Sequence, residues 1–386
     1  MLCWRRSLPY LLSPILRTHH LTFQAKMPAL LRRVHTCLNL RGMTRSAHIG
    51  RVLSVAFLLE TLLWGTDVAW ADKSAEPLAV DIKEYALPTP NALPHDPALG
   101  PDSSLWFTEQ KANKIGRLEP TTGRIREFPL RTRDSGPHGL VVDKQGNVWF
   151  TANSKGYIGK LNAESGEVAE YPLKDERAKD PHTPTFDAKG TLWFTVQEGN
   201  LIGRLDPKSG EVRLKEVPTP KARPYGIVVG KDGAPYFCEF GTNKLGRVDP
   251  VTLEIREYAL PSGARPRRIA LALDGTLFYS DYARGMLGHF FPQDGRVEEW
   301  ASPGGPTSKP YGIAVTPDGQ VWYSESGVSP NTLVRFNPLT QRFAEATIPS
   351  GGGVVRNMAS TPQGRLYLAC SGVNRVAIAT PRQERG

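Results

Sequence analysis

Seven polar residues occupy equivalent places in the chain, each immediately before a short apolar run. An imidazole near neutral pH can act as a general base or bind a metal, and phenol and guanidinium groups hydrogen bond to polar ligands. Packing alone does not require this mixture, so the set is a candidate binding site; a polar lining of a water-filled channel is the alternative. The seven residues are His95, His138, His182, Tyr225, Arg267, Tyr311 and Arg356.

These positions recur because the chain repeats one sequence unit seven times. Each unit contains a strand that is marked by an aromatic residue, usually followed by a second one. Successive copies are 42 to 45 residues apart, which is the length of a four-stranded β-propeller blade. The sequence therefore predicts an all-β, seven-bladed β-propeller of antiparallel blades. The first aromatic residue of this strand in each copy is Trp106, Trp149, Trp193, Tyr236, Phe278, Trp322 or Tyr367.

The two ends of the repeat region predict how the ring closes. The chain enters the repeats with an outermost type of strand at 82–87, and it leaves them with the three other types over 358–379. If the first strand completes the last blade by pairing with 374–379, no sheet edge is left exposed. We therefore expect one domain over 82–379, closed by its N-terminal strand.

The polar residues are expected to share one face of this domain. The innermost strand of a blade and its neighbour run antiparallel, so the start of one lies beside the end of the other. The seven polar residues then form a ring around one mouth of the channel and would bind substrate there. A second ring at the ends of the aromatic strands comprises Glu109, Ala152, Val196, Glu239, Asp281, Glu325 and Cys370.

Residues 43–71 have the pattern of an export signal. From Met43 a basic segment precedes an apolar run and an Ala-Trp-Ala sequence, which is typical of a cleaved signal peptide. The run is short and contains Glu60, which disfavours the alternative of a single anchoring helix. We expect a periplasmic or secreted monomer with no stable membrane span after cleavage. The expected segments are an upstream extension at 1–42, a signal peptide at 43–71, a linker at 72–81 and a tail at 380–386.

Most of the net charge belongs to this leader. The whole chain has a net charge of +10, and residues 1–71 contain nine Lys or Arg and two Asp or Glu. The remaining residues therefore have a net charge of only +3. Such a balance gives no support to a nucleic-acid partner.

Several repeated phrases resemble the streptogramin lyase family, of the virginiamycin B lyase type. They are Pro-His-Gly-Leu, Leu-Trp-Phe-Thr-Glu, Asn-Lys-Ile-Gly-Arg-Leu and Glu-Tyr-Ala-Leu-Pro-Thr-Pro, and the resemblance covers roughly residues 82–379. It implies a Mg²⁺-dependent carbon–oxygen lyase. Such an enzyme linearises a cyclic depsipeptide or related ester by removing the proton α to a carbonyl, without hydrolysis.

The same resemblance implies roles for four residues. His182 would be the base, His138 would contact the substrate, and Asp180 with Glu198 would bind Mg²⁺. The sequence departs from the family pattern at three places. Aspartate replaces glutamate at 180, Thr183-Pro184 replaces Gly-Ile, and the alignment of Glu198 needs a shift of one residue, with Gln197 in the expected place.

Two other functions remain open on the sequence. One is a non-catalytic exported propeller that binds a peptide, glycan or protein partner on its channel face, because a fold alone does not fix a function. The other is a metal-dependent lactonase of the gluconolactonase-like type, which would hydrolyse an ester. Neutral ligands for such a metal would come from Asn113, Asn153, Asn200 and Asn243.

Overall fold

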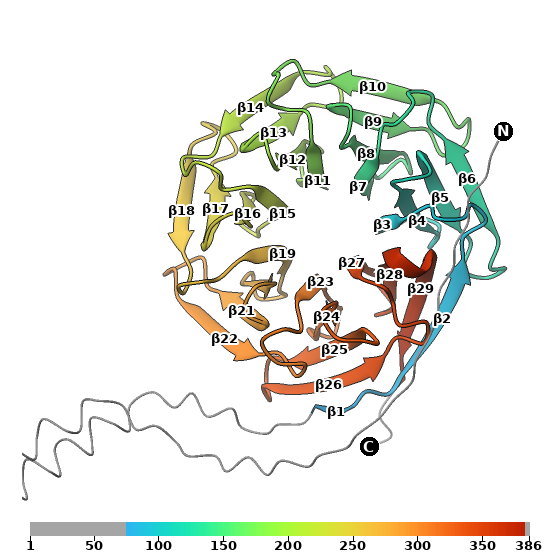
Figure 1. Ribbon diagram of the computed structural model, residues 1–386. Helices are drawn as coiled ribbons and strands as arrows, with labels where there is room; N and C mark the ends of the chain where they lie inside the picture. The colour runs from blue at the N-terminus through green and yellow to red at the C-terminus, as the bar shows by residue number, and fades with distance from the viewer. Residues whose placement is uncertain (1–74, 383–386) are drawn as a thin grey trace, which may run out of the picture. The chain divides into compact units, whose positions relative to one another are not determined.

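The computed structural model describes residues 75–382, which form seven antiparallel blades around a central channel (Figure 1). The predicted seven-bladed propeller is confirmed. The upstream extension, the signal peptide and the last four residues of the tail lie outside the described residues. Within the described range, no helix has the length and apolar character needed to cross a membrane.

The blades are numbered 1 to 7 by their innermost strands, and each blade adds strands outward from the channel. The innermost strands are β3 (Pro94–Leu99), β7 (Pro137–Val142), β11 (Pro181–Phe186), β15 (Pro224–Val229), β19 (Pro266–Leu271), β23 (Pro310–Val315) and β27 (Val355–Ser360). The second strands are β4 (Leu105–Glu109), β8 (Val148–Ala152), β12 (Leu192–Val196), β16 (Pro235–Glu239), β20 (Leu277–Asp281), β24 (Val321–Glu325) and β28 (Leu366–Cys370).

The two outer layers complete the sheets. The third strands are β5 (Lys114–Leu118), β9 (Tyr157–Leu161), β13 (Leu201–Leu205), β17 (Lys244–Val248), β21 (Met286–Phe290), β25 (Thr332–Asn337) and β29 (Arg375–Pro381). The outermost strands are β6 (Ile125–Pro129), β10 (Val168–Pro172), β14 (Val212–Glu216), β18 (Ile255–Ala259), β22 (Val297–Ala301), β26 (Arg342–Thr347) and, in blade 7, β2 (Val80–Ala86). A short 3₁₀ helix, η2 (Ser371–Val373), follows β28.

The first long strand closes the ring as predicted. β2 pairs antiparallel with β29, with Ile82 opposite Ala379 and Ala86 opposite Arg375. Figure 1 shows β2 at the rim of the blade that β27, β28 and β29 begin. The segment expected to be a linker also contains strand. β1 (Glu76–Pro77) pairs in parallel with β26 and gives blade 6 a fifth strand.

The Ile-Gly-Arg phrases have a packing reason. In blade 2 a Cβ added to Gly159 would lie 2.1 Å from Cζ of Phe150, so glycine is needed for the ring of the second strand to cross the third. The tryptophans of the second strands are at most 2% exposed and pack between blades, as expected for core residues. These contacts hold the strand starts at fixed places around the channel.

A bulge interrupts every innermost strand at the ring. In blade 1, Pro94 is opposite Glu109 but the next paired residue is Pro97, opposite Phe107. The two residues between them, His95 and Asp96, have no partner in the ladder. The same shift occurs in all seven blades. Bulges re-aim side chains in this way, and here they turn the ring residues toward the channel.

A hydroxyl group on the second strand satisfies the backbone groups that the bulge frees. Thr151 accepts a hydrogen bond from the N–H of Gly139 in its own blade (2.9 Å) and donates one to the carbonyl of His182 in the next blade (2.7 Å). Ring residues are therefore tied to the preceding blade. Equivalent bonds to the ring residue of the next blade come from Thr108, Thr195 and Ser280, and Ser324 bonds to the carbonyl of Val355, just before the ring residue of blade 7.

Removal of this hydroxyl should destabilise the propeller. Thr151→Val keeps the shape of the side chain but leaves a buried N–H and a buried carbonyl without partners, which costs about 2 kcal/mol. Chemical denaturation should show the loss, and Thr151→Ser should retain most of the stability. Equal stability of the valine and wild-type proteins would contradict this role for the hydroxyl.

Candidate functional site

Four ring residues from successive blades pack against one another at the mouth of the channel, with their ring planes tilted by 42°, 50° and 52° from one to the next. The ring centroids of His95 and His138 are 3.6 Å apart, those of His138 and His182 are 3.8 Å apart, and those of His182 and Tyr225 are 3.9 Å apart. Each side chain is 2 to 5% exposed. The expected convergence of the strand starts is therefore present in blades 1 to 4.

The three histidines are held in their neutral form. Burial lowers the pKa of each imidazole well below its usual value, and nearby charges that include Arg268 lower it further. For His95 the largest of these charges is that of Arg356. Among the described residues, no group hydrogen bonds to Nε2 of any of the three, and these atoms are not sealed from solvent. They can meet a ligand as neutral donors or acceptors.

A buried ion pair lies one residue further along the innermost strands. Nη2 of Arg268 in blade 5 donates to Oδ1 of Asp96 in blade 1 (2.7 Å), and Nη1 donates to Oγ1 of Thr183 in blade 3 (3.1 Å). Asp96 and Arg268 are 1% and 3% exposed. A cavity of about 280 Å³ reaches Arg268 and Thr183 among the later residues of the inner strands. The pair thus spans the channel beneath the histidines.

The sequence analysis missed these residues, although a signal was present. The residue after the ring position is glycine in blades 2, 4 and 6, where a Cβ would crowd the backbone of the following blade. In the other four blades a polar side chain occupies this place. Those residues are Asp96, Thr183, Arg268 and Asn357.

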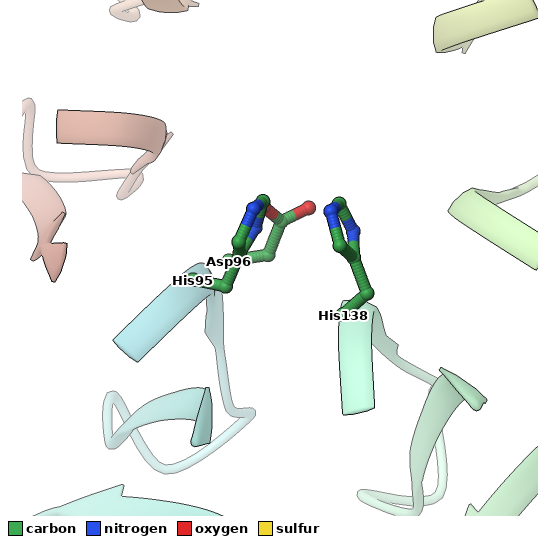
Figure 2. A group of neighbouring side chains, drawn as sticks. All are labelled: His95, Asp96 and His138. Atoms are coloured by element: carbon green, nitrogen blue, oxygen red, sulfur yellow. The ribbon is translucent and has the colours of Figure 1, made fainter. Parts of the chain in front are cut away.

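Asp96 also sets the orientation of His95. Figure 2 shows both side chains converging with His138 from the neighbouring blade. Nδ1 of His95 lies 2.9 Å from Oδ1 of Asp96. The carboxylate that receives Arg268 is an acceptor, so Nδ1 carries the proton and the lone pair of His95 is at Nε2.

The orientation of His182 is different. Its Nδ1 lies 2.9 Å from Oγ1 of Thr183, which already accepts from Arg268. The threonine hydroxyl therefore has its hydrogen available for Nδ1, and this arrangement places the imidazole proton on Nε2. His182 then offers a donor at the mouth of the channel, whereas His95 offers an acceptor.

The other side of the ring is aromatic and cationic. The hydroxyl groups of Tyr225 and Tyr311 are 2.5 Å apart. The guanidinium of Arg267 lies 3.9 Å from the ring centroid of Tyr311, 4.2 Å from that of Tyr282 and 4.8 Å from that of Phe240. Such cation–π contacts hold the guanidinium in place.

The two residues expected to bind Mg²⁺ have other partners in the structure. Oδ2 of Asp180 accepts the N–H of Glu198 (2.7 Å) and Oδ1 faces that of Gly199 (3.3 Å). The exposed carboxylate of Glu198 instead pairs with Arg223. The carboxylate of Asp180 is therefore held by the backbone at 198–199, and that of Glu198 is held by Arg223.

One group of possible metal ligands exists among residues 75–382, formed by His95, Asp96 and His138, whose ligand atoms lie within 4.8 Å of one another. Two imidazoles and one carboxylate do not suit Mg²⁺, which prefers oxygen ligands. The carboxylate already pairs with Arg268. The residues present therefore do not fit the metal that the family resemblance implies.

The other candidate ligands serve the framework. The side-chain amides of the four asparagines considered for a lactonase donate to loop or strand carbonyls. The acids at the ends of the second strands lie beside the ring in register, but their partners lie in loops or outer strands and not at the ring positions. For example, burial raises the pKa of Glu109 most, the charge of Glu127 in β6 raises it further, and that of Lys114 in β5 lowers it.

Together these features define a closed propeller with a neutral histidine stack over a buried ion pair. A family model described as the virginiamycin B lyase family matches residues 53–327, and the chain belongs to this family. A structure of streptogramin B lyase is similar, with 28% identity, a TM-score of 0.72 and coverage of 79% of this chain and 98% of that chain.

Two structures from Staphylococcus aureus are also similar. Virginiamycin B lyase has 25% identity and a TM-score of 0.72, with coverage of 78% of this chain and 100% of that chain. A catalytically inactive histidine-to-alanine variant of virginiamycin B lyase, with quinupristin, has 24% identity and a TM-score of 0.71 at the same coverage. This last likeness is one of fold.

The buried acid Glu109 should make stability depend on pH. Its carboxyl oxygens are buried without a hydrogen-bond partner, and burial, followed by the charge of Glu127, raises its pKa from 4.5 to about 8. The unfolded chain releases this proton at a lower pH than the folded protein does. The stabilising contribution is therefore complete below the unfolded value and is lost as the pH rises through about 8.

Glu109→Gln should remove this dependence. Thermal melts between pH 5 and pH 9 should show a flatter profile for the variant, which should be more stable than the wild type at the alkaline end. Glu167→Gln, at an exposed position of the same molecule, is the control and should follow the wild-type profile. An unchanged profile for Glu109→Gln would show that the acid is already ionised in the folded protein across this range.

Proposed function

We propose that the protein binds a cyclic peptide ester or related ester across the ring and opens it by elimination. The proposal is carried by the hydrogen bond from Nδ1 of His95 to Asp96, because it leaves the lone pair of the imidazole on Nε2. The imidazole is neutral, and Nε2 is not sealed from solvent. Membership of the virginiamycin B lyase family supports this type of reaction. The rings are nearly buried, so the ester would lie over the mouth of the channel.

The reaction requires a base close to a carbon–hydrogen bond. The base takes the proton α to a carbonyl, the electron pair of that bond forms a carbon–carbon double bond, and the β carbon–oxygen bond breaks. The carboxylate of the former ester leaves with the bonding pair. A lowered pKa keeps the imidazole fully in its basic form at neutral pH, and general-base catalysis typically contributes about 10² to 10⁴ in rate.

His95 has the better geometry for the base, and His182 is suited to binding. Asp96 orients the proton of His95 away from the substrate, as carboxylates do for catalytic imidazoles. His182 can donate from Nε2 to a carbonyl oxygen of the substrate. His182 as the base, the role implied by family resemblance, requires the other arrangement of the hydrogen bond with Thr183.

No step of this reaction is assigned to Mg²⁺, because the carboxylate of Asp180 accepts backbone N–H groups and that of Glu198 pairs with Arg223. The same observation supports a second candidate function, which is binding without turnover. In that case the stack and the arginines would hold a peptide or ester ligand, and no bond would break.

Quinupristin provides a direct test. Elimination should give a linear isomer of unchanged mass and hydrolysis would add one water, so chromatography with mass spectrometry in ¹⁸O-labelled water separates the reactions. His95→Ala should lower kcat/KM by about 10² to 10⁴, and His182→Ala should mainly raise KM. Loss of turnover in His182→Ala alone would return the role of base to His182.

The control is His289→Gln, which changes a buried histidine of β21 that contacts Thr276 and lies outside the ring. Its turnover should match the wild type once melting shows that it is folded. Binding of quinupristin without any product would support the binding function. A magnesium requirement that disappears in Asp180→Asn would overturn the assignment made from the occupied carboxylate.

A further inference from the structure

The side chains at and just behind the ring positions have more positive charges than negative charges. Three positive charges lie close enough to Tyr311 to lower the pKa of its hydroxyl, against the larger raising effect of burial; they belong to Arg267, Arg268 and Arg356. The histidines beside these arginines are neutral. The carboxylate of Asp96 is matched to Arg268. Two guanidinium charges at the mouth of the channel are therefore left without a carboxylate among the described residues.

Most of the donors on these two arginines are unused. The side chain of Arg356 makes no hydrogen bond to any residue in the described range, and its Nε is buried without a partner while its Nη atoms reach solvent. Arg267 makes one bond, from Nη2 to the hydroxyl of Tyr225 (3.3 Å), and its Nε is also buried and unpartnered. A guanidinium has five donors, so both can accept a further ligand.

The two arginines occupy equivalent ring positions two blades apart. Arg267 is the second residue of β19 in blade 5 and Arg356 is the second residue of β27 in blade 7, with Tyr311 at the ring position of blade 6 between them. Both charges also lower the pKa of His95. The aromatic rings around Arg267 fix one guanidinium, whereas the half-buried Arg356 is free to meet a ligand.

We infer that Arg356 and Arg267 form a carboxylate-binding site at the mouth of the channel, beside His95. A guanidinium matches a planar carboxylate through two parallel hydrogen bonds. The partly exposed aromatic rings of Tyr282 and Phe240, which contact Arg267, supply an apolar wall for the rest of the ligand. The site takes an organic carboxylate, with a peptide C-terminus as the matching chemical class.

This inference rests on the proposed function in one respect: the bound carboxylate is identified as the leaving group of the ester. When elimination breaks the β carbon–oxygen bond, the ester oxygen departs as part of a carboxylate. Arg356 would stabilise the charge that develops on this leaving group while Nε2 of His95 takes the α proton. Positive charge is then supplied by side chains of the chain itself.

Binding measured without turnover tests the site. The probes are N-acetylphenylalanine and its C-terminal amide, which differ in the anionic group, and titration calorimetry gives their affinities for the full chain. The wild type should prefer the carboxylate by about tenfold or more. Arg356→Gln should abolish the preference, Arg356→Lys should keep part of it, and raised salt should weaken it.

Arg126→Gln is the matched control, because this arginine is exposed on β6; it should bind both probes as the wild type does. Equal affinity of the wild type for acid and amide, or an unchanged preference in both Arg356 variants, would overturn the site. Inorganic phosphate that binds more tightly than the carboxylate would overturn the class of ligand. If the protein prefers the carboxylate but does not turn over quinupristin, this binding site stands and the lyase function is wrong. If it turns over quinupristin without that preference, the lyase function stands and this binding site is wrong.

Discussion

The hydrogen bonds of the second-strand hydroxyls are the constraint on which the ring depends. A bulge frees the backbone groups of the residues at the channel mouth, and buried backbone groups must find partners. Thr151 supplies both, one in its own blade and one in the next. Each hydroxyl therefore stabilises the bulge and sets the spacing between blades. The close stacking of the histidines follows from this spacing.

The ion pair of Asp96 and Arg268 is the second organising element. Its desolvation is costly, and removing either partner would leave a buried charge. Bonds from Arg268 to blades 1 and 3 join residues that are 172 and 85 positions away in sequence. The pair fixes the tautomer of His95 and biases that of His182. The proton positions of the ring histidines thus depend on residues one place further along the inner strands.

The fold could be predicted because every repeat contains the residues that its own packing requires, such as the glycine at 159 that makes room for the ring of Phe150. The ring positions followed from the same period, and so did the closure by residues 82–87. The direction of individual carboxylates could not be predicted. Asp180 is drawn to the backbone at 198–199 and Glu198 to Arg223, and these are local contacts outside the repeat. The channel pair of Asp96 and Arg268 was missed because its partners lie in non-adjacent blades.

The position of β2 has a consequence for the order in which the protein folds. β2 is synthesised before every other strand of its blade, yet its partner β29 ends at Pro381, so this contact joins the two ends of the domain. Contacts of such sequence separation form slowly. Blades 1 to 5 can collapse as they emerge, but blade 7 cannot form until β29 has been synthesised. During that interval β2 and the open edge of the growing ring are unpaired, and the chain is most vulnerable to association with other strands.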